Sequence, residues 1–235
     1  MTKADKLWKT FNRALGQYQL ISDDDHILVG LSGGKDSLCL LEMLARRSHI
    51  LKPRFSIEAL HVRMENVSYE TDTTYLQQFC DTLGVPLHVV TTSFEASNKK
   101  PPCFLCSWQR RKQLFNMAQE LGCNKIALGH HQDDIIHTAL MNLTFQGNFS
   151  TMPALLRMKK MPLTVIRPLC LCQESDIQAY AEQQGYQKQL KQCPYEHDTN
   201  RTAIQDLFQH MQQLNPEARY AIQHALETAG KLIEY

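Results

Sequence analysis

The stretch HILVGLSGGKDSL, residues 26–38, joins an apolar run to a glycine-rich turn and then to a helix-like segment. The run 26–31 is typical of a buried strand, and the segment from Asp36 to Arg47 repeats leucine at helical spacing. Between them, Gly33 and Gly34 allow a sharp turn that brings backbone N–H groups toward an anion, at a helix N-terminus that also favours negative charge. The stretch therefore predicts a phosphate-binding loop at the carboxyl end of a strand.

This loop does not follow the Walker A pattern of phosphate-binding loops. Its glycines are too closely spaced, and Asp36 stands where that pattern requires Ser or Thr. In the loop we expect Ser32 and Ser37 to donate hydroxyl hydrogen bonds and Lys35 to neutralise phosphate charge. Asp36 is expected either to cap the helix or to approach a bound Mg²⁺.

Strand-like and helix-like segments alternate along the rest of the chain. The expected strands are 26–31, 55–64, 87–91, 124–130 and 163–168, and the expected helices are 36–47, 69–83, 107–121, 132–145 and 175–184. Two further helices, joined at Asn215-Pro216, are expected from residue 200 onward. Because helices between strands imply crossover connections, the pattern predicts an α/β fold with a doubly wound, mostly parallel sheet and helices on both faces.

Length and composition favour a single domain. The chain has 235 residues, of which 43% are hydrophobic, and can bury one sizeable core. We expect residues 1–235 to form one domain, with an N-terminal helical segment over about residues 1–22 and a C-terminal helical extension over about residues 200–235. The polar, amphipathic N-terminal stretch has no apolar run typical of a signal or membrane span, so we expect a cytoplasmic protein that does not bind membranes.

The net charge of the chain does not by itself indicate a nucleic-acid partner. The formal net charge is +1, so any nucleic-acid contact must come from local basic patches, for which 98–100, 110–112 and 157–160 are candidates. Each patch could equally be an ordinary solvated face.

A second polar cluster, LGHHQDDIIHT, spans residues 128–138 and again follows a strand and opens a helix. Carboxylates at Asp133 and Asp134 would suit the helix dipole, and His130 and His131 could simply fill the turn. However, the carboxyl ends of parallel strands meet at one edge of a sheet, which places this cluster across from the phosphate loop. That position favours magnesium binding and charge compensation.

The eight cysteines indicate metal or sulfur chemistry, because the cytosol keeps thiols reduced. Cys103 and Cys106 form a CxxC expected just before a helix, which could be half of a metal site, a redox pair or two ordinary thiols. Cys193, in a loop, is a candidate third ligand, and the pair Cys170 and Cys172 competes with it. The remaining three, at 39, 80 and 123, are expected to be small packed residues.

SGGKDS, residues 32–37, resembles the signature of the PP-loop ATP pyrophosphatase superfamily, which cleaves ATP between the α and β phosphates. Together with CFLC, LGHHQDD, VIRPL at 165–169 and a loop cysteine before Asn200-Arg201, the chain from about Ile27 to Phe208 resembles the tRNA 2-thiocytidine synthetase family. Lysidine synthetases commonly carry a glutamate in the helix after GHHxDD, whereas this chain has Ile135, Ile136 and His137 there.

The resemblance implies specific sites. Catalytic roles fall on Lys35, Asp36, Asp133 and Asp134, and ATP contacts on Ser32, Gly33, Gly34, Lys35, Asp36, Ser37, His61, Gly129 and His130. A [4Fe–4S] cluster is implied on Cys103, Cys106 and Cys193, with one iron left open to carry sulfur. Members often have a second CxxC-like pair at the third position, where this chain has only Cys193-Pro194.

The implied activity is that of an AMP-forming tRNA sulfurtransferase that uses ATP and Mg²⁺. It would adenylate the C2 oxygen of an anticodon-loop cytidine and replace that oxygen by sulfur. The tRNA would be held through Lys99, Lys100, Arg110, Arg111 and Lys112, and a cysteine desulfurase is a suitable sulfur donor. Assembly as a homodimer is compatible with this activity. The alternatives are a PP-loop synthetase or ligase for a small molecule, with structural zinc or no metal, and a nucleotide-binding module without turnover.

Overall fold

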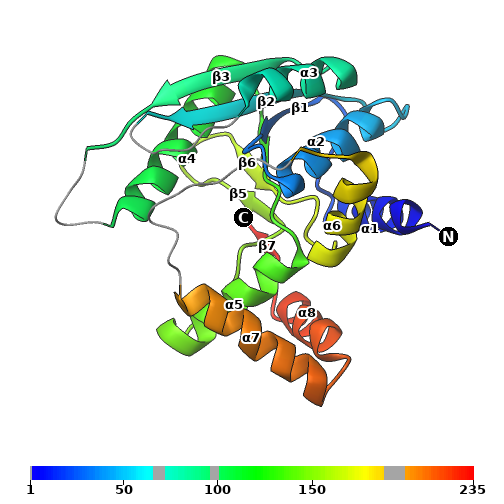
Figure 1. Ribbon diagram of the computed structural model, residues 1–235, viewed down its shortest axis with the longest axis vertical. Helices are drawn as coiled ribbons and strands as arrows, with labels where there is room; N and C mark the ends of the chain where they lie inside the picture. Colours follow the sequence, from blue (N-terminus) through cyan, green and yellow to red (C-terminus); the bar gives the residue numbers. More distant parts are fainter. Residues whose placement is uncertain (1, 66–71, 96–100, 188–198) are drawn as a thin grey trace.

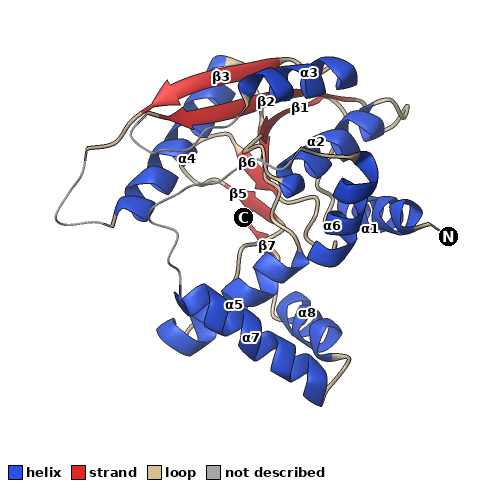
Figure 2. Cartoon of the chain, viewed as in Figure 1, coloured by secondary structure: helices blue, strands red, loops and turns tan. Residues whose placement is uncertain are grey.

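A twisted seven-stranded sheet with helices on both faces organises the computed structural model, which describes residues 2–65, 72–95, 101–187 and 199–235 (Figure 1, Figure 2). In spatial order the strands are β3 Leu87–Thr92, β2 Phe55–Met64, β1 Asp25–Gly30, β4 Lys125–Ala127, β6 Thr164–Ile166, β5 Leu155–Arg157 and β7 Ile233–Glu234. All neighbouring strands run parallel except β5 and β6, which are antiparallel. The predicted fold class is therefore confirmed.

The helices are distributed between the two faces and one end of the sheet (Figure 1). They are α1 Lys3–Gln17, α2 Lys35–Ser48, α3 Thr73–Leu83, α4 Pro102–Glu120, α5 Gln132–Gln146, α6 Glu174–Gln184, α7 Thr199–Leu214 and α8 Ala218–Thr228. Helices α1, α2, α3 and α6 share the larger apolar core on one face, and α4 covers the other. Helices α5, α7 and α8 pack on one another. Within the described ranges, no helix combines the length and apolarity needed to cross a membrane.

Strand β1 lies inside the sheet, between β2 and β4, and is buried on both faces. Ile27 and Val29 pack into the core shared with α1 and α2, whereas Leu28, which points the other way, packs into the core beneath α4. This two-sided burial explains the consecutive apolar residues at 27–29, since a strand covered on both faces needs apolar side chains that point each way.

The two polar loops meet at the point where the strand order reverses. Strand β1 pairs with β2 on one side and with β4 on the other, so that Val29 lies beside both Ala59 and Ala127. The loops that follow β1 and β4 consequently leave the same edge of the sheet on either side of a crevice. In doubly wound sheets this crevice is where ligands bind.

Several boundaries differ from the expectation. Helix α4 begins at Pro102 rather than 107, since proline is well suited to the first position of a helix, so Cys103 and Cys106 lie inside the helix and not ahead of it. Helix α3 begins at Thr73, capped by Asp72, and the expected start at 69 lies outside the described residues. Strands β5 and β7, of three and two residues, were not predicted.

Candidate active site

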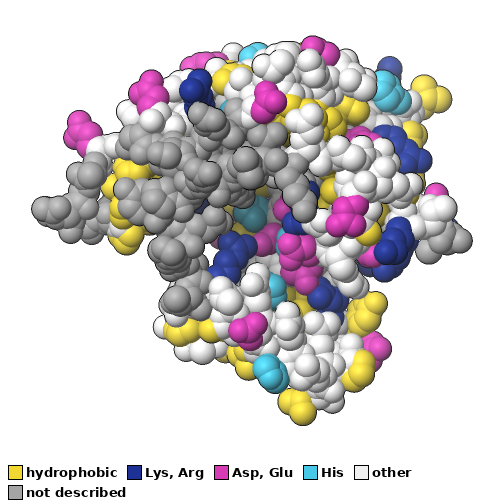
Figure 3. Space-filling model, in the orientation of Figure 1, with side chains coloured by type: hydrophobic (Ala, Val, Ile, Leu, Met, Phe, Trp, Pro, Cys, Tyr) yellow, Lys and Arg dark blue, Asp and Glu magenta, His cyan; other side chains and the backbone are white. Residues whose placement is uncertain are grey.

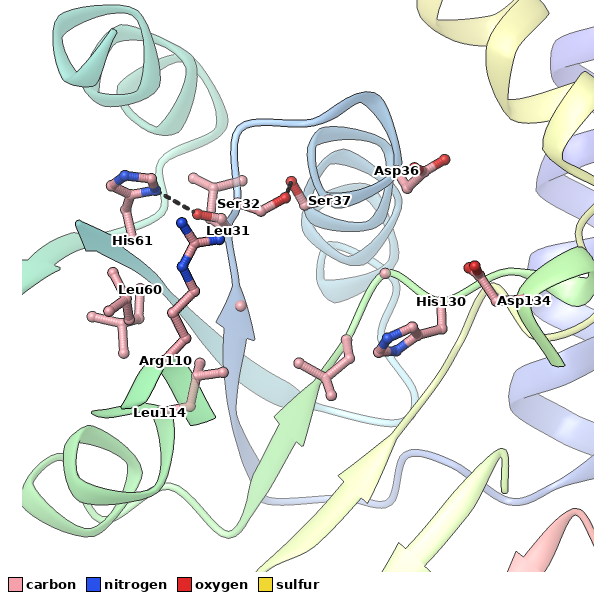
Figure 4. Close-up of a pocket in the computed structure, with 14 residues that line it drawn as sticks. Leu31, Ser32, Asp36, Ser37, Leu60, His61, Arg110, Leu114, His130 and Asp134 are labelled. Atoms are coloured by element: carbon pink, nitrogen blue, oxygen red, sulfur yellow. Dashed lines mark hydrogen bonds between the residues drawn. The ribbon is translucent and has the colours of Figure 1, made fainter. Parts of the chain in front are cut away.

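A pocket of about 280 Å³ opens at the carboxyl ends of β1 and β4, beside residues 60–62 of β2 (Figure 4). Its wall contains seven residues predicted to bind ATP or act in catalysis, namely Ser32, Asp36, Ser37, His61, Gly129, His130 and Asp134. Arg110 and Leu114 of α4 complete the side opposite α2. Of the other predicted residues, Gly33, Gly34, Lys35 and Asp133 lie outside this wall.

The loop between β1 and α2 has one left-handed turn and a set of internal hydrogen bonds. Gly33 has φ of 84°, a left-handed conformation that favours glycine. Gly34 has φ of −76° and is the N-cap of α2, so both glycines lie in the turn but only Gly33 adopts the left-handed conformation. Ser37 Oγ donates to the Gly34 carbonyl at 2.9 Å, and Ser32 Oγ donates to Ser37 Oγ at 3.2 Å. Asp36 does not cap α2, which has no side-chain cap.

The loop after β4 touches the start of α2 through a residue without a side chain. A Cβ added to Gly129 would lie 3.1 Å from the carbonyl carbon and oxygen of Asp36 and 3.2 Å from the amide nitrogen of Ser37. These are backbone atoms, which cannot swing aside as a side chain does. The absence of a Cβ at Gly129 therefore lets the two loops form one wall.

We expect Gly129→Ala to weaken ATP binding by about tenfold or more, because the added methyl would push the phosphate loop away from β4. Calorimetric titration with a non-hydrolysable ATP analogue measures this. Gly16→Ala is the matched control, since nothing lies within 4 Å of a Cβ at Gly16. Unchanged affinity in Gly129→Ala would show that the contact is not needed for the pocket.

Two histidines of the wall are neutral at pH 7. His61 is buried, burial lowers its pKa, and its Nδ1 lies 2.8 Å from the Leu31 carbonyl oxygen, so Nδ1 carries the proton and donates. Burial and the nearby Arg167 lower the pKa of His130 to about 4. Neutral imidazoles can exchange hydrogen bonds with a base or ribose, but they do not supply a positive charge for phosphate.

The two aspartates at the start of α5 are both held by arginines from the C-terminal helices. Asp133 accepts from Arg219 Nη2 at 2.6 Å and from the Glu174 N–H at 2.8 Å, which joins α8 and α6 to α5. Burial raises the pKa of Asp133, but the hydrogen bonds from Arg219 and Glu174 outweigh it and the pKa is lowered. Asp134 accepts from Arg201 Nη2 at 2.6 Å and also from the His131 N–H. Of the two, only Asp134 lines the pocket.

Replacing Arg219 by methionine should destabilise the protein by about 3 kcal/mol, because Asp133 would keep a buried charge without its main partner. Urea unfolding followed by circular dichroism measures the change. Arg157→Met should cost less than about 1 kcal/mol, since Arg157 is exposed and rests on the ring of Tyr235. Equal losses in the two variants would contradict a special role for the Arg219–Asp133 pair.

The cysteines separate into accessible and buried groups. Cys103 is exposed and Cys106 half-buried in the first turns of α4, while Cys193 lies outside the described residues. Cys170 and Cys172 are 0% and 1% exposed, and burial raises the pKa of the Cys172 thiol to about 12. Burial of this kind disfavours the thiolate that a metal requires. Cys39, Cys80 and Cys123 are buried, as expected.

Helix α4 connects the accessible thiols to the pocket. Cys103, Cys106, Arg110 and Leu114 follow one another at intervals of three, four and four residues, which places them on one face of the helix. Arg110 and Leu114 line the pocket, and the rise from Cys103 to Arg110 is roughly 10 Å. Arg110, an expected tRNA contact, lies in the pocket wall, and its contact with tRNA stays a prediction.

The remaining predicted tRNA contacts are partly described. Arg111 and Lys112 are exposed on α4, and Lys99 and Lys100 lie outside the described residues. On the face drawn in Figure 3, basic, acidic and histidine side chains gather between the sheet and α7. Sequence reasoning missed Glu174 and Arg219 as partners of the site. Arg201 was noted only as part of a resemblance, with no role.

A glycine-turn loop and an acidic loop at the switch point of a doubly wound sheet define a nucleotide-binding α/β protein. A family model described as the PP-loop domain matches residues 5–205. The tRNA-cytidine(32) 2-sulfurtransferase of Shewanella oneidensis is 34% identical over 88% of this chain and 69% of its own length, and that of Pseudomonas putida strain W619 is 32% identical over 96% and 86%. The chain therefore belongs to the PP-loop family and, within it, to the family of the tRNA-cytidine(32) 2-sulfurtransferases.

Solved structures agree on the fold. The U34-tRNA thiolase NcsA from Methanococcus maripaludis, solved with its [4Fe–4S] cluster, superposes with a TM-score of 0.80 at 24% identity, covering 97% of this chain and 78% of NcsA. The NH3-dependent NAD synthetase of Campylobacter jejuni has a TM-score of 0.53 at 13% identity, covering 97% and 95%. At these identities the likeness concerns the fold alone.

Proposed function

We propose that this protein is an AMP-forming tRNA sulfurtransferase that replaces the C2 oxygen of cytidine 32 by sulfur. The relatives that share its family carry this activity in their name. The observation that carries the proposal is the single face of α4, which aligns an accessible thiol pair with the wall of a nucleotide pocket. A small-molecule synthetase would need the pocket but not the thiols.

In the first half-reaction the cytidine C2 oxygen attacks the α-phosphorus of ATP, and pyrophosphate leaves. The amides at the start of α2 and the Lys35 ammonium stabilise charge that develops on the pyrophosphate. Asp36 and Asp134 are the carboxylates of the pocket wall and the candidates for Mg²⁺. Asp133 lies outside the pocket wall and joins α5 to α6 and α8 through Glu174 and Arg219.

In the second half-reaction sulfur attacks C2 and AMP leaves with the former C2 oxygen. Cys103 and Cys106 fit a [4Fe–4S] cluster, because both are accessible thiols one turn apart, whereas Cys170 and Cys172 are enclosed in the core. We assign Cys193 as the third ligand. When bound, the cluster supplies an open iron site for exogenous sulfide, and a cysteine desulfurase is a suitable source of that sulfur.

The outer side of α4 is suited to single-stranded RNA. Phe104 and Trp108 are each 48% exposed and lie one turn apart, and Arg111 and Lys112 follow on the same side. Exposed aromatic rings can stack on unpaired bases, while the cations contact phosphates. An anticodon loop offers both unpaired bases and phosphates. We infer a tRNA substrate bound along α4, in a protein that acts in the cytoplasm as one domain.

The products of ATP use test the first half-reaction. Protein reconstituted anaerobically with iron and sulfide should form AMP and pyrophosphate from ATP only when unmodified tRNA is present. ADP with inorganic phosphate as products would contradict PP-loop chemistry. AMP formation driven by a small carboxylate or amine without tRNA would favour the small-molecule synthetase.

A further inference from the structure

Lys35 of the phosphate loop is bound by an acidic residue that lies 139 positions further along the chain. Lys35 Nζ donates to Glu174 Oε1 at 2.9 Å and to Asp36 Oδ2 at 3.2 Å. A lysine ammonium has three N–H groups, so these two acceptors leave one donor for a bound anion. The direction of that third donor is set by where the two carboxylates stand.

Glu174 is itself held in place. It is the first residue of α6, and its backbone N–H donates to Asp133 Oδ2 at 2.8 Å. Asp133 is fixed in turn by Arg219 of α8. Helix α6 also packs on α1 and α2, so the Glu174 backbone cannot shift without moving several helices. The side chain of Glu174 is 47% exposed and that of Lys35 26%, which places the pair at the edge of the site rather than in the core.

Lys35 receives one contact from its own helix, through Asp36, and the second from Glu174. It is the first residue of α2, its side chain lies outside the wall of the cavity, and a lysine has four rotatable bonds. Asp36, its neighbour in sequence, supplies one contact and is itself a candidate for Mg²⁺. Glu174 is the acceptor that comes from a different element and that lies outside the pocket wall.

We propose that Glu174 is a positioning residue for the reaction, which holds the Lys35 ammonium so that its remaining N–H faces the phosphates bound at the loop. The inference rests on the proposed function of the loop as an ATP site. Glu174 acts through Lys35 and does not touch the substrate. Its effect should thus fall on the step in which charge develops on pyrophosphate, more than on the binding of ATP.

The test compares Glu174→Gln with Asp176→Asn in the reconstituted enzyme. Asp176 is the matched control, because it lies in the same turn of α6 and pairs with Lys6 at 2.9 Å, away from the loop. For Glu174→Gln we expect kcat for AMP formation to fall about tenfold and KM for ATP to change less than about threefold. Asp176→Asn should leave both unchanged. Unchanged kcat in Glu174→Gln would overturn the proposal.

A double-mutant cycle on pyrophosphate binding tests the coupling of Lys35 and Glu174 even if tRNA thiolation is never detected. Affinity for inorganic pyrophosphate is measured by calorimetry in the wild type, Lys35→Met, Glu174→Gln and the double variant. Glu174→Gln should weaken binding about threefold in the wild type and not at all in the Lys35→Met background. Equal effects in both backgrounds, or tighter binding in Glu174→Gln, would contradict a role through Lys35. Loss of pyrophosphate binding in Lys35→Met with no thiolation in the wild type would instead remove only the proposed function.

Discussion

Replacing Asp36 by alanine should lower AMP and pyrophosphate formation by roughly a thousandfold, the largest effect of any single change in the nucleotide pocket. Asp36 lies in the pocket wall at the start of α2, contacts Lys35, and approaches Gly129 through its backbone. Its carboxylate is a hard oxygen ligand of the kind Mg²⁺ requires. Removing it takes away both the candidate metal ligand and an acceptor that orients Lys35.

The fold should survive this change. The Asp36 side chain is 30% exposed and caps no helix, so its loss should cost less than about 1 kcal/mol. Thermal unfolding of wild type, Asp36→Ala and the isosteric Asp36→Asn checks this, and both variants should be equally inactive because the charge is what matters. Normal pyrophosphate release by a folded Asp36→Ala protein would remove Asp36 from the mechanism.

Replacing Cys103 or Cys106 by alanine should remove most of the bound iron and abolish tRNA thiolation, while ATP affinity stays within about twofold of the wild type. Both thiols lie outside the pocket wall, and they precede the pocket residues Arg110 and Leu114 along α4. The same outcome is expected for Cys193→Ala. Iron content and the visible absorption of anaerobic protein measure cluster loss, and calorimetry with an ATP analogue measures the pocket.

The buried cysteines provide the controls. Cys170→Ala and Cys172→Ala should retain iron, because both thiols are enclosed in the core and burial raises the pKa of Cys170 well above its usual value. Cys39→Ala, in the same core, should also retain iron. If Cys193→Ala keeps its iron while Cys170→Ala or Cys172→Ala loses it, the third ligand is wrong. Anaerobic protein that binds zinc tightly and no iron would contradict the sulfur-transfer mechanism itself.

The parts of this fold that could be predicted are those with a local signal. Strand β1 is apolar at Ile27, Leu28 and Val29 because these residues are buried on both faces, and α5 opens directly after a polar turn. Strands β5 and β7 could not be predicted, because three and two residues are too few to show the alternation of apolar and polar side chains that marks a strand. Helix α4 starts at Pro102, five residues before the expected start at 107, because proline suits the first turn of a helix.

The partners of the site could not be predicted, because they are distant in sequence. Arg201 meets Asp134 across 67 positions, Arg219 meets Asp133 across 86, and Glu174 meets Lys35 across 139. Residue types and local motifs bring both aspartates to one loop, but they do not distinguish the one that lines the pocket from the one that holds helices. The structure separates them, because both accept from arginines of the C-terminal helices but only Asp134 lies in the pocket wall.

Nucleoside analysis of the tRNA shows whether this protein replaces the C2 oxygen of cytidine 32 by sulfur. Unmodified tRNA with cytidine at position 32 is incubated with the reconstituted protein, ATP, Mg²⁺ and sulfide, digested to nucleosides and examined by mass spectrometry. We expect a cytidine with one sulfur in place of the C2 oxygen, formed with AMP in equal amount. No thiolated nucleoside should form when position 32 is uridine. AMP formation with full iron loading but unchanged cytidine would contradict the proposed function.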